Sequence, residues 1–526
     1  DIILKRRERS GLMIAFYERA LDRLDDRWAS RGKTGEDLLP PDHPYAGDID
    51  IFGKGSLFEL LCAARTMAGE RALAAWLCAP ATAETIRMRQ QAVQELRAGL
   101  DLREDLAHYG SDVRSGVRPG SLASWAGAPR LLTSRPMRAA AVVLAVLAPA
   151  SLAAWIAWGR PLAFFAVLIL EVVFASMLRR KTKKVEQAAS GPSRELNVLA
   201  GVLARLEREP FESRLLVDLQ AVLKEGDMSA SRRIAKLERL VGLVQAQRNP
   251  LFALITFPVL WGVHLSFMIE DWRERWGSRV PCWLEAVGEL EALCSLAAYA
   301  YEHPGDPFPE IVEEAGAAVF DAEGLGHSLI PACRCVRNDM RLGENPAIMI
   351  VSGSNMSGKS TLLRTVGVNT VLAHAGAPVR AVKLQLSPLA MGATIRILDS
   401  IQSGTSRFMS EITRLKQIMD MASRENSGFP VLFLLDEILH GTNSHDRAIG
   451  AAALAEALVK AGAIGLMTTH DLALASIADN MGKAAANVHF MDRFEDGKQS
   501  FDFKLRSGVV QGSNALKLMR SVGLEV

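Results

Sequence analysis

The fold is decided by one stretch, residues 347–360, which reads Ala-Ile-Met-Ile-Val-Ser-Gly-Ser-Asn-Met-Ser-Gly-Lys-Ser. Its first five residues are apolar and mostly β-branched, a pattern typical of a buried strand. Gly353 to Ser360 then follow the phosphate-binding pattern G-x-x-x-x-G-K-[ST], in the strand, loop and helix context that this pattern requires. The stretch therefore predicts a site for the phosphates of a nucleotide.

The residue types of this loop suit phosphate chemistry. Glycines let backbone N–H groups close around phosphate oxygens, and the following helix offers its positive N-terminal end. Lys359 is expected to reach the outer phosphates and Ser360 to ligate magnesium. The predicted cofactors are ATP and Mg²⁺, and the predicted nucleotide-binding residues are Gly353, Ser354, Asn355, Met356, Ser357, Gly358, Lys359, Ser360 and Thr361.

Two further apolar stretches end in residues that suit ATP hydrolysis. Residues 431–435 run into Asp436 and Glu437, and residues 463–467 run into Thr468, Thr469 and His470. An acidic pair at a strand end can supply one carboxylate to magnesium and one to orient and deprotonate a water, while a histidine can sense the terminal phosphate. The predicted catalytic residues are Glu437, His470 and Lys359, and the predicted magnesium ligands are Ser360 and Asp436.

Apolar residues are concentrated in a few places, which explains the slightly positive mean hydropathy. Residues 139–158 carry no charge, and residues 161–178 carry only Glu171. Each run is long enough to cross a bilayer, and the short connection predicts a hairpin. Basic residues on both flanks predict that both ends lie in the cytoplasm, so the protein is expected to be a multi-pass inner (cytoplasmic) membrane protein with a cytoplasmic ATPase domain. The alternative is a hairpin buried in a large soluble core.

A third apolar run, residues 251–269, contains Pro258 and His264. A single crossing there would place the phosphate loop on the side of the membrane that lacks ATP. We therefore expect a buried or interfacial pair of helices broken at Pro258, with re-entry or a second hairpin as the alternative.

Composition excludes several classes of protein. The 526 residues are 49% hydrophobic and carry 61 basic against 59 acidic side chains, which excludes a mainly disordered chain and a uniformly basic one. The six cysteines are too scattered for a disulfide framework, and Cys333-x-Cys335 lacks the second pair or histidines of a metal site. These counts indicate a reducing compartment.

Four ordered segments resemble the MutS family of DNA mismatch-repair ATPases. Residues 353–361 resemble the family's G-x-N-M-x-G-K-S-T loop, and residues 436–446 its D-E-[IL]-x-x-G-T-x-x-x-D segment. Residues 406–411 resemble its S-T-F-M-x-E segment, and Thr469-His470 its T-H motif. Residues 55–80 are similar to the start of the MutS helical core, so the resemblance covers most of the chain outside the hairpin. Transporter ATPases fit less well, because no L-S-G-G-Q pentapeptide is present.

The resemblance implies an α-helical core and lever region followed by an α/β P-loop ATPase domain of ABC-like type, and the two apolar runs add a transmembrane helical hairpin to the helical region. Four divisions are expected. Residues 1–130 form a helical region that includes the start of the core, and residues 131–184 form the hairpin with its basic flanks. Residues 185–305 form a helical core and lever region, and residues 306–526 form the ATPase domain. The resemblance further implies a homodimer with composite sites, in which Ser406 acts in trans on the nucleotide of the other subunit and Asn355 responds to the terminal phosphate.

By the same resemblance the partner is DNA, held by basic helices around Arg232, Arg233, Lys236 and Arg239, although a solvated helix face is an equal interpretation of this cluster. The sequence also departs from the family. Core-like sequence begins by about Asp42, so no mismatch-reading domain is expected in this sequence, and Arg407 replaces the usual threonine. The expected function is a MutS-like ATPase coupled to binding of mismatched or structured DNA; the alternative is a membrane-tethered mechanochemical or scaffold ATPase that acts on membrane proteins or lipid without DNA.

Overall fold

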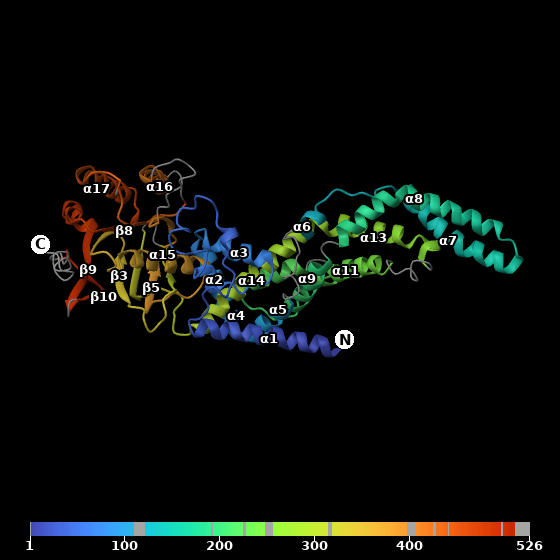
Figure 1. Ribbon diagram of the computed structural model, residues 1–526, viewed down its shortest axis with the longest axis horizontal. Helices are drawn as coiled ribbons and strands as arrows, with labels where there is room; N and C mark the ends of the chain where they lie inside the picture. The colour runs from blue at the N-terminus through green and yellow to red at the C-terminus, as the bar shows by residue number, and fades with distance from the viewer. Residues whose placement is uncertain are drawn as a thin grey trace. The chain divides into compact units, whose positions relative to one another are not determined.

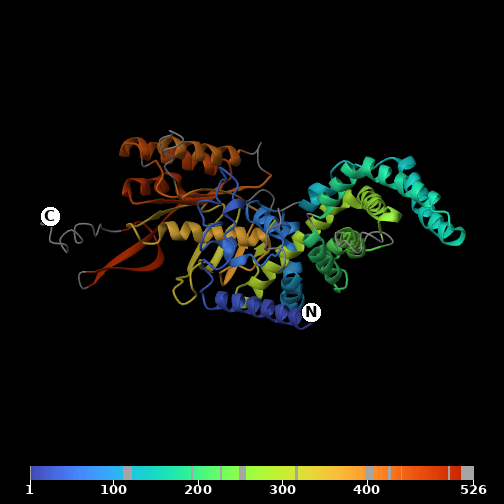
Figure 2. The same cartoon turned by 45° about the vertical axis from the view of Figure 1, so that its right-hand side comes forward.

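The structure is a computed structural model of the 526-residue chain. It describes residues 2–109, 121–190, 193–224, 228–247, 256–313, 318–396, 407–423, 428–439, 441–495 and 498–510. The chain forms two compact units, which Figures 1 and 2 show from two directions. The helical unit comprises residues 1–16, 64–69 and 100–291, and the mixed unit comprises residues 17–63, 70–99 and 292–526.

The helical unit is built from long helices, most of which are labelled in Figure 1. Buried Ile234, Leu237, Val241 and Val244 follow one face of α11 at spacings of three and four, and α11 contacts α9 and α13. The elements of this unit are α5 (Leu100–Tyr109), α6 (Ser121–Ala126), α7 (Arg135–Trp158), α8 (Leu162–Ser190), α9 (Ser193–Leu206), α10 (Arg214–Lys224), α11 (Ala230–Ala246), η3 (Phe257–Val259), α13 (Trp261–Trp276) and η4 (Gly277–Arg279). Three helices contribute residues to both units: α1 (Ile2–Leu24), α3 (Met67–Leu77) and α14 (Val280–Glu302).

Helices α7 and α8 form the expected helical hairpin. α7 ends at Gly159, whose φ of 68° lies in the left-handed region that glycine adopts without a Cβ clash. Both helices are long and apolar enough to cross a membrane, and only 17% and 11% of their most apolar windows are buried. Their large side chains face outward, with Ile156 80% and Leu162 84% exposed. This exposure disagrees with the alternative of a hairpin buried in a soluble core.

The third apolar run breaks at Pro258, as expected, because η3 precedes α13 there. α13 has 16 residues, which is short for a membrane span, and its Val263, Leu265 and Phe267 are buried. The described part of this run is thus a core helix; residues 251–255 lie outside the described residues.

The mixed unit contains two sheets, in agreement with the predicted change to α/β structure. A four-stranded sheet has the order β1-β5-β2-β3, and a six-stranded sheet has the order β10-β9-β4-β8-β7-β6. Their strands are β1 (Glu310–Ile311), β2 (Phe320–Leu325), β3 (Asn338–Leu342), β4 (Ile348–Ser352), β5 (Lys383–Leu386), β6 (Ala390–Thr394), β7 (Val431–Leu435), β8 (Ile464–Thr469), β9 (Ala485–Glu495) and β10 (Lys498–Ser507). The helical elements of this unit are η1 (Glu36–Leu38), α2 (Leu57–Leu61), α4 (Ala83–Ala98), α15 (Lys359–Ala375), α16 (Arg407–Ala422), α17 (Ser444–Lys460), η5 (Leu472–Ala475), α18 (Ser476–Met481) and η6 (Gly482–Ala484).

The six-stranded sheet is parallel from β9 to β6, and only β10 pairs antiparallel. Strands β4, β7 and β8 are buried at every position, as their continuous apolar sequence predicts. Helices α16 and α17 join the apolar core on one face, which includes Phe433 and Leu435. α15 packs on the other face, where a Cβ at Gly367 would touch Leu434. Because β4, β8 and β7 are parallel neighbours, the residues that follow them gather at one edge of the sheet.

Candidate nucleotide site

The phosphate loop lies between β4 and α15, as the sequence predicts. Gly358 precedes the first turn of α15 with a φ of 106°, a conformation that favours glycine. A Cβ at Gly353 would lie 2.7 Å from the Ser357 hydroxyl, so this position needs glycine for close approach. Met356 stands at the apex with a φ of 68° and is 85% exposed. The loop thus turns back tightly on the start of α15.

Lys359 is folded back into this loop. Its side chain is buried, and Nζ donates hydrogen bonds to the carbonyl oxygens of Gly353 at 2.7 Å and Ser354 at 3.0 Å. The hydroxyls of Ser354 and Ser357 are buried without a hydrogen-bond partner among the described residues. Buried hydroxyls of this kind are usually satisfied, so two of them in one glycine-rich loop indicate space for an acceptor from outside the chain.

The acidic pair after β7 is held by the end of β8. The hydroxyl of Thr468 donates to Asp436 Oδ1, and the backbone N–H of Glu437 donates to the same hydroxyl at 3.0 Å. Glu437 adopts a φ of 45°, which is uncommon for a residue with a Cβ. One threonine therefore fixes both carboxylate-bearing residues at the sheet edge.

Lys359, Glu437 and His470 form a chain of polar contacts. Glu437 Oε1 lies 3.2 Å from Lys359 Nζ and 3.4 Å from His470 Nδ1. Burial raises the pKa of the Glu437 carboxyl, but the charges and hydrogen bonds of Lys359 and His470 outweigh burial and hold that pKa below its ordinary value. The carboxylate is consequently ionised at neutral pH and suited to accept a proton only from a strongly polarised donor.

Glu411 is a positioning residue of this edge. It lies in α16, is buried, and its Oε1 accepts the backbone N–H of Leu439 at 2.5 Å. Leu439 has a φ of 59°, so the segment after the acidic pair contains a second left-handed residue that this hydrogen bond supports. The resemblance includes Glu411 in residues 406–411 but implies no role for it.

The structure brings most of the predicted site residues together. Lys359, Glu437 and His470 are in direct contact, and Asp436 is joined to them through Thr468. Ser360 and Thr361 begin α15 beside the loop. Ser406, predicted to act in trans, and His440 lie outside the described residues, as does the side chain of Arg407. The trans contact therefore stays a prediction.

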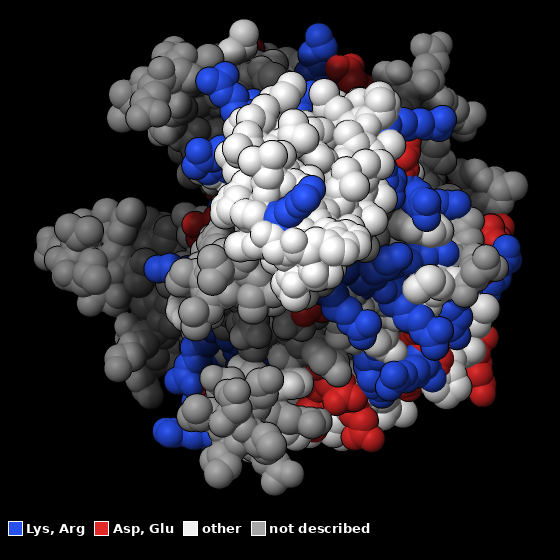
Figure 3. Space-filling view, turned by 90° about the vertical axis from the view of Figure 1, so that its right-hand side faces the viewer, with Lys and Arg blue, Asp and Glu red and all other residues white. Residues whose placement is uncertain are grey.

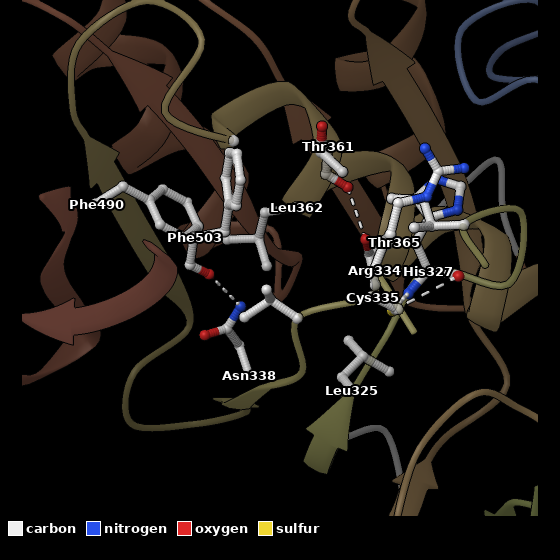
Figure 4. A pocket seen from close by; sticks show the side chains of 13 residues that line it. Leu325, His327, Arg334, Cys335, Asn338, Thr361, Leu362, Thr365, Phe490 and Phe503 are labelled. Atoms are coloured by element: carbon white, nitrogen blue, oxygen red, sulfur yellow. Dashed lines mark hydrogen bonds between the residues drawn. The ribbon is translucent and has the colours of Figure 1, made fainter. Parts of the chain in front are cut away.

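A pocket that the sequence did not predict adjoins the loop (Figure 4). It has a volume of about 190 Å³ and lies between the start of α15, the segment that joins β2 to β3, and strands β9 and β10. Phe503 covers Gly358, since a Cβ there would lie 3.1 Å from its ring. The lining side chains include Leu325, His327, Arg334, Cys335, Asn338, Thr361, Leu362, Thr365, Phe490 and Phe503.

The polar members of this pocket are held in place. Asn338 donates from Nδ2 to the Phe503 carbonyl at 3.0 Å and accepts the Leu505 N–H at 2.8 Å, so β3 fixes the bulged part of β10. The backbone N–H of His327 contacts Cys335 Sγ at 3.3 Å. Burial lowers the pKa of His327 to about 4, so its imidazole is neutral at physiological pH. Apolar walls with a few fixed polar groups suit a flat heterocycle attached to the phosphates.

Comparison with known proteins gives matches on both sides of residues 145–348. The family model for MutS domain V matches residues 349–525, and the model for MutS domain III matches residues 45–144. The domain V match contains the loop, the acidic pair and His470.

Curated relatives agree with these matches. A protein named DNA mismatch repair protein MutS 2 from Halobacterium salinarum is 32% identical over 250 residues, which are 47% of this chain and 28% of the relative. DNA mismatch repair protein MutS of Aquifex pyrophilus is 32% identical over 243 residues, 45% of this chain and 27% of the relative. Endonuclease MutS2 of Thermus thermophilus is 31% identical over 246 residues, 47% of this chain and 31% of the relative. The chain thus spans less than a third of the length of these relatives. The helical core, the α/β domain and their matches together show that this chain belongs to the MutS family.

Proposed function

We propose that the protein is a MutS-like ATPase that binds ATP with Mg²⁺ at residues 353–361 and hydrolyses it. The observation that carries this proposal is the contact chain of Lys359, Glu437 and His470 beside a glycine-rich loop. The same edge holds Asp436 through Thr468. Few other chemistries need a loop lysine, two carboxylates and a histidine at the ends of three parallel neighbouring strands.

The donor set fits magnesium. Among the described residues no group of three or more His, Cys, Asp or Glu side chains could hold a metal alone. Mg²⁺ in nucleotide sites usually takes one or two protein oxygens together with phosphates and waters, so the Ser360 hydroxyl and the Asp436 carboxylate suffice. When bound, the ion neutralises charge that develops on the phosphate oxygens.

The residues of the chain then have distinct tasks. Lys359, now held by two loop carbonyls and Glu437, exchanges these contacts for oxygens of the outer phosphates. The exchange releases Glu437 to orient and deprotonate the attacking water. His470, which lies beside Glu437, then contacts the terminal phosphate. The pocket of Figure 4 receives the base, which Phe503 and Phe490 flank.

An exposed apolar surface supports the proposed homodimer. Met356 is 85%, Met409 57% and Ile449 57% exposed, in the phosphate loop, α16 and α17 respectively. Helices α16 and α17 contact each other, and the loop apex that carries Met356 belongs to the nucleotide site. We propose that a second copy of the chain covers these side chains; the action of its Ser406 on the nucleotide stays a prediction.

DNA is the proposed partner at the level of the family. Arg232, Lys236 and Arg239 are exposed on α11 and suit contacts to backbone phosphates. The prediction for Arg233 is wrong: this side chain is buried, and its guanidinium lies 3.6 Å from the centre of the Trp276 ring. The basic surface of α11 is therefore smaller than the sequence indicated.

We further propose that residues 139–178 enter the inner (cytoplasmic) membrane, with the ATPase domain in the cytoplasm. The exposed hairpin also supports the second candidate function, a membrane-tethered mechanochemical or scaffold ATPase without a DNA substrate. The divisions at residues 131, 185 and 306 stay predictions, as does the ABC-like type of the ATPase domain.

One experiment separates the two functions. Binding to homoduplex, mismatched and branched DNA is titrated with salt, with and without ATP, using the full chain in detergent. Binding that weakens as salt rises supports the DNA function, and the triple substitution Arg232→Gln, Lys236→Gln and Arg239→Gln should reduce the salt slope by about three. Absence of salt-sensitive binding to all three DNAs would overturn the DNA function and favour the second candidate.

A further inference from the structure

The base of the hairpin, where α7 begins and the apolar part of α8 ends, is charged unequally on its two sides. On the α7 side, Arg138 donates to Asp271 Oδ2 at 2.7 Å. Arg130 pairs with Asp271 at 3.5 Å and with Glu274 at 2.6 Å. Two of the three arginines of the predicted basic flank are therefore neutralised by carboxylates of α13, while Arg135 is exposed and makes no ion pair with a described residue.

The α8 side differs. Five cationic side chains, here called the basic belt, are all exposed and make no ion pair with any residue in the described part of the chain: Arg179, Arg180, Lys181, Lys183 and Lys184. The opposite side of the same helical segment is buried at Leu178, Thr182, Val185 and Ala189, and α8 contacts α13 and α11. Packing thus fixes the direction of the belt, which points away from the core of the helical unit.

The belt continues the exposed apolar surface of the hairpin without a gap. Val172, Val173 and Met177 are 48%, 50% and 70% exposed in α8, and Arg179 follows within two residues. In the view of Figure 3, a largely uncharged surface (white) faces the reader and Lys and Arg side chains (blue) gather at one side of it. A ligand that contacts both the apolar surface of the hairpin and the basic belt must have an apolar part next to an anionic part.

We propose that the basic belt binds the phosphate groups of anionic phospholipids in the leaflet through which the hairpin enters. This inference rests on the proposed membrane insertion and adds a selectivity for head-group charge to it. Lipid satisfies both surfaces, because its chains meet the apolar part of α8 and its head groups lie at the level where that part ends. A nucleic acid satisfies only the charges. Arg130 and Arg138 contribute little, since their charge is already compensated.

The test uses the full chain, diluted from detergent onto preformed vesicles of phosphatidylcholine, alone or with phosphatidylglycerol, and measured by flotation. The variant Lys181→Gln/Lys183→Gln/Lys184→Gln removes three exposed, unpaired charges, so it should fold normally. The matched control Arg232→Gln/Lys236→Gln/Arg239→Gln removes three exposed charges from α11. At low salt we expect the wild type and the control to bind the anionic vesicles at least about tenfold better than the neutral ones, and the belt variant to lose most of this preference.

The outcomes separate this inference from the insertion on which it rests. If the hairpin inserts, the wild type resists extraction with alkaline carbonate from both kinds of vesicle; extraction by carbonate would overturn the insertion itself. Resistance to carbonate with equal binding to both vesicles overturns only the role of the belt. An unchanged preference in the belt variant also overturns it. A belt variant that loses DNA affinity while it keeps the lipid preference would assign these charges to nucleic acid instead.

Discussion

The two units of the chain differ in how far their apolar side chains are buried and their charged side chains are paired. In the mixed unit, strands β4, β7 and β8 are fully buried, and the charged residues at their ends contact one another. In the helical unit, α7 and α8 expose most of their large apolar side chains, and α8 leaves five cations unpaired among the described residues. The described charged groups at the strand ends of the mixed unit gather around a ligand site, whereas the helical unit presents a surface that suits an extended apolar and anionic environment. Variants of one unit should therefore leave the property of the other unchanged.

The largest expected effect is on membrane attachment. Replacement of residues 139–178 by a short Gly-Ser linker should move the protein entirely from the membrane to the soluble fraction, because it removes the exposed apolar surface of both helices. The rest of α8 is retained with its buried Thr182, Val185 and Ala189, so nucleotide affinity should stay within about twofold of the wild type. Fractionation and titration with a fluorescent ATP analogue measure the two properties. Continued sedimentation with membranes would assign attachment to residues 251–269 or to a partner.

The next largest effect is on turnover. Glu437→Gln keeps the shape of the side chain but removes the base, so ATP hydrolysis should fall by roughly 10² to 10⁴ while ATP still binds. Lys359→Ala is the contrasting variant, since it should lose nucleotide binding itself. Steady-state hydrolysis and equilibrium binding distinguish the two, and both variants should remain attached to membranes. Hydrolysis at the wild-type rate in Glu437→Gln would refute the assigned role of this residue.

The residues at the sheet edge of the site could be predicted from the sequence, because the topology of the strands determines where these residues lie. Parallel neighbouring strands place the residues after them at one edge, so Lys359, Asp436, Glu437 and His470 could be grouped without coordinates. The hairpin was equally readable, since its length and lack of charge are local properties. The exposure of the hairpin could not be predicted from its apolar sequence alone. Helix α14 is also rich in apolar residues, yet its Trp283 and Tyr299 are buried.

Two parts of the molecule could not be predicted. The pocket of Figure 4 joins His327, Asn338 and Phe503, which come from three segments with no motif, and a bulge in β10 sets the position of Phe503. Arg233 resembles its exposed basic neighbours along α11, and only the tertiary position of Trp276 shows that it is stacked and buried. Both cases depend on contacts between residues far apart in the sequence.

A smaller effect tests the pocket. Phe503→Ala removes the ring that covers Gly358, so affinity for ATP should fall by about tenfold, the usual range for loss of one aromatic stacking partner of a base. Phe501→Ala is the matched control, because Phe501 stacks on Phe503 with ring centres 6.0 Å apart but does not line the pocket. Equal affinities of the two variants would argue that the base lies elsewhere. Lipid binding should not change in either.

The smallest effect concerns pH and two buried histidines of the mixed unit. Burial lowers the pKa values of His327 and His374 to about 4, whereas both histidines take up a proton near pH 6.5 when the chain unfolds. The unfolded state therefore binds more protons between these values, and stability should fall as the pH decreases from about 6.5 toward 4, by about 1 to 2 kcal/mol per histidine at pH 5.

His374→Gln isolates one of these two groups. His374 Nε2 accepts the backbone N–H of Leu389 at 3.2 Å, and the carbonyl oxygen of glutamine can accept it in the same way without titrating. Urea unfolding at pH 7 and pH 5, followed in one detergent, should show that the variant loses less stability on acidification than the wild type, by about 1 to 2 kcal/mol. An identical loss in both proteins would refute the contribution of His374 and would assign the sensitivity to acid to other groups of the chain.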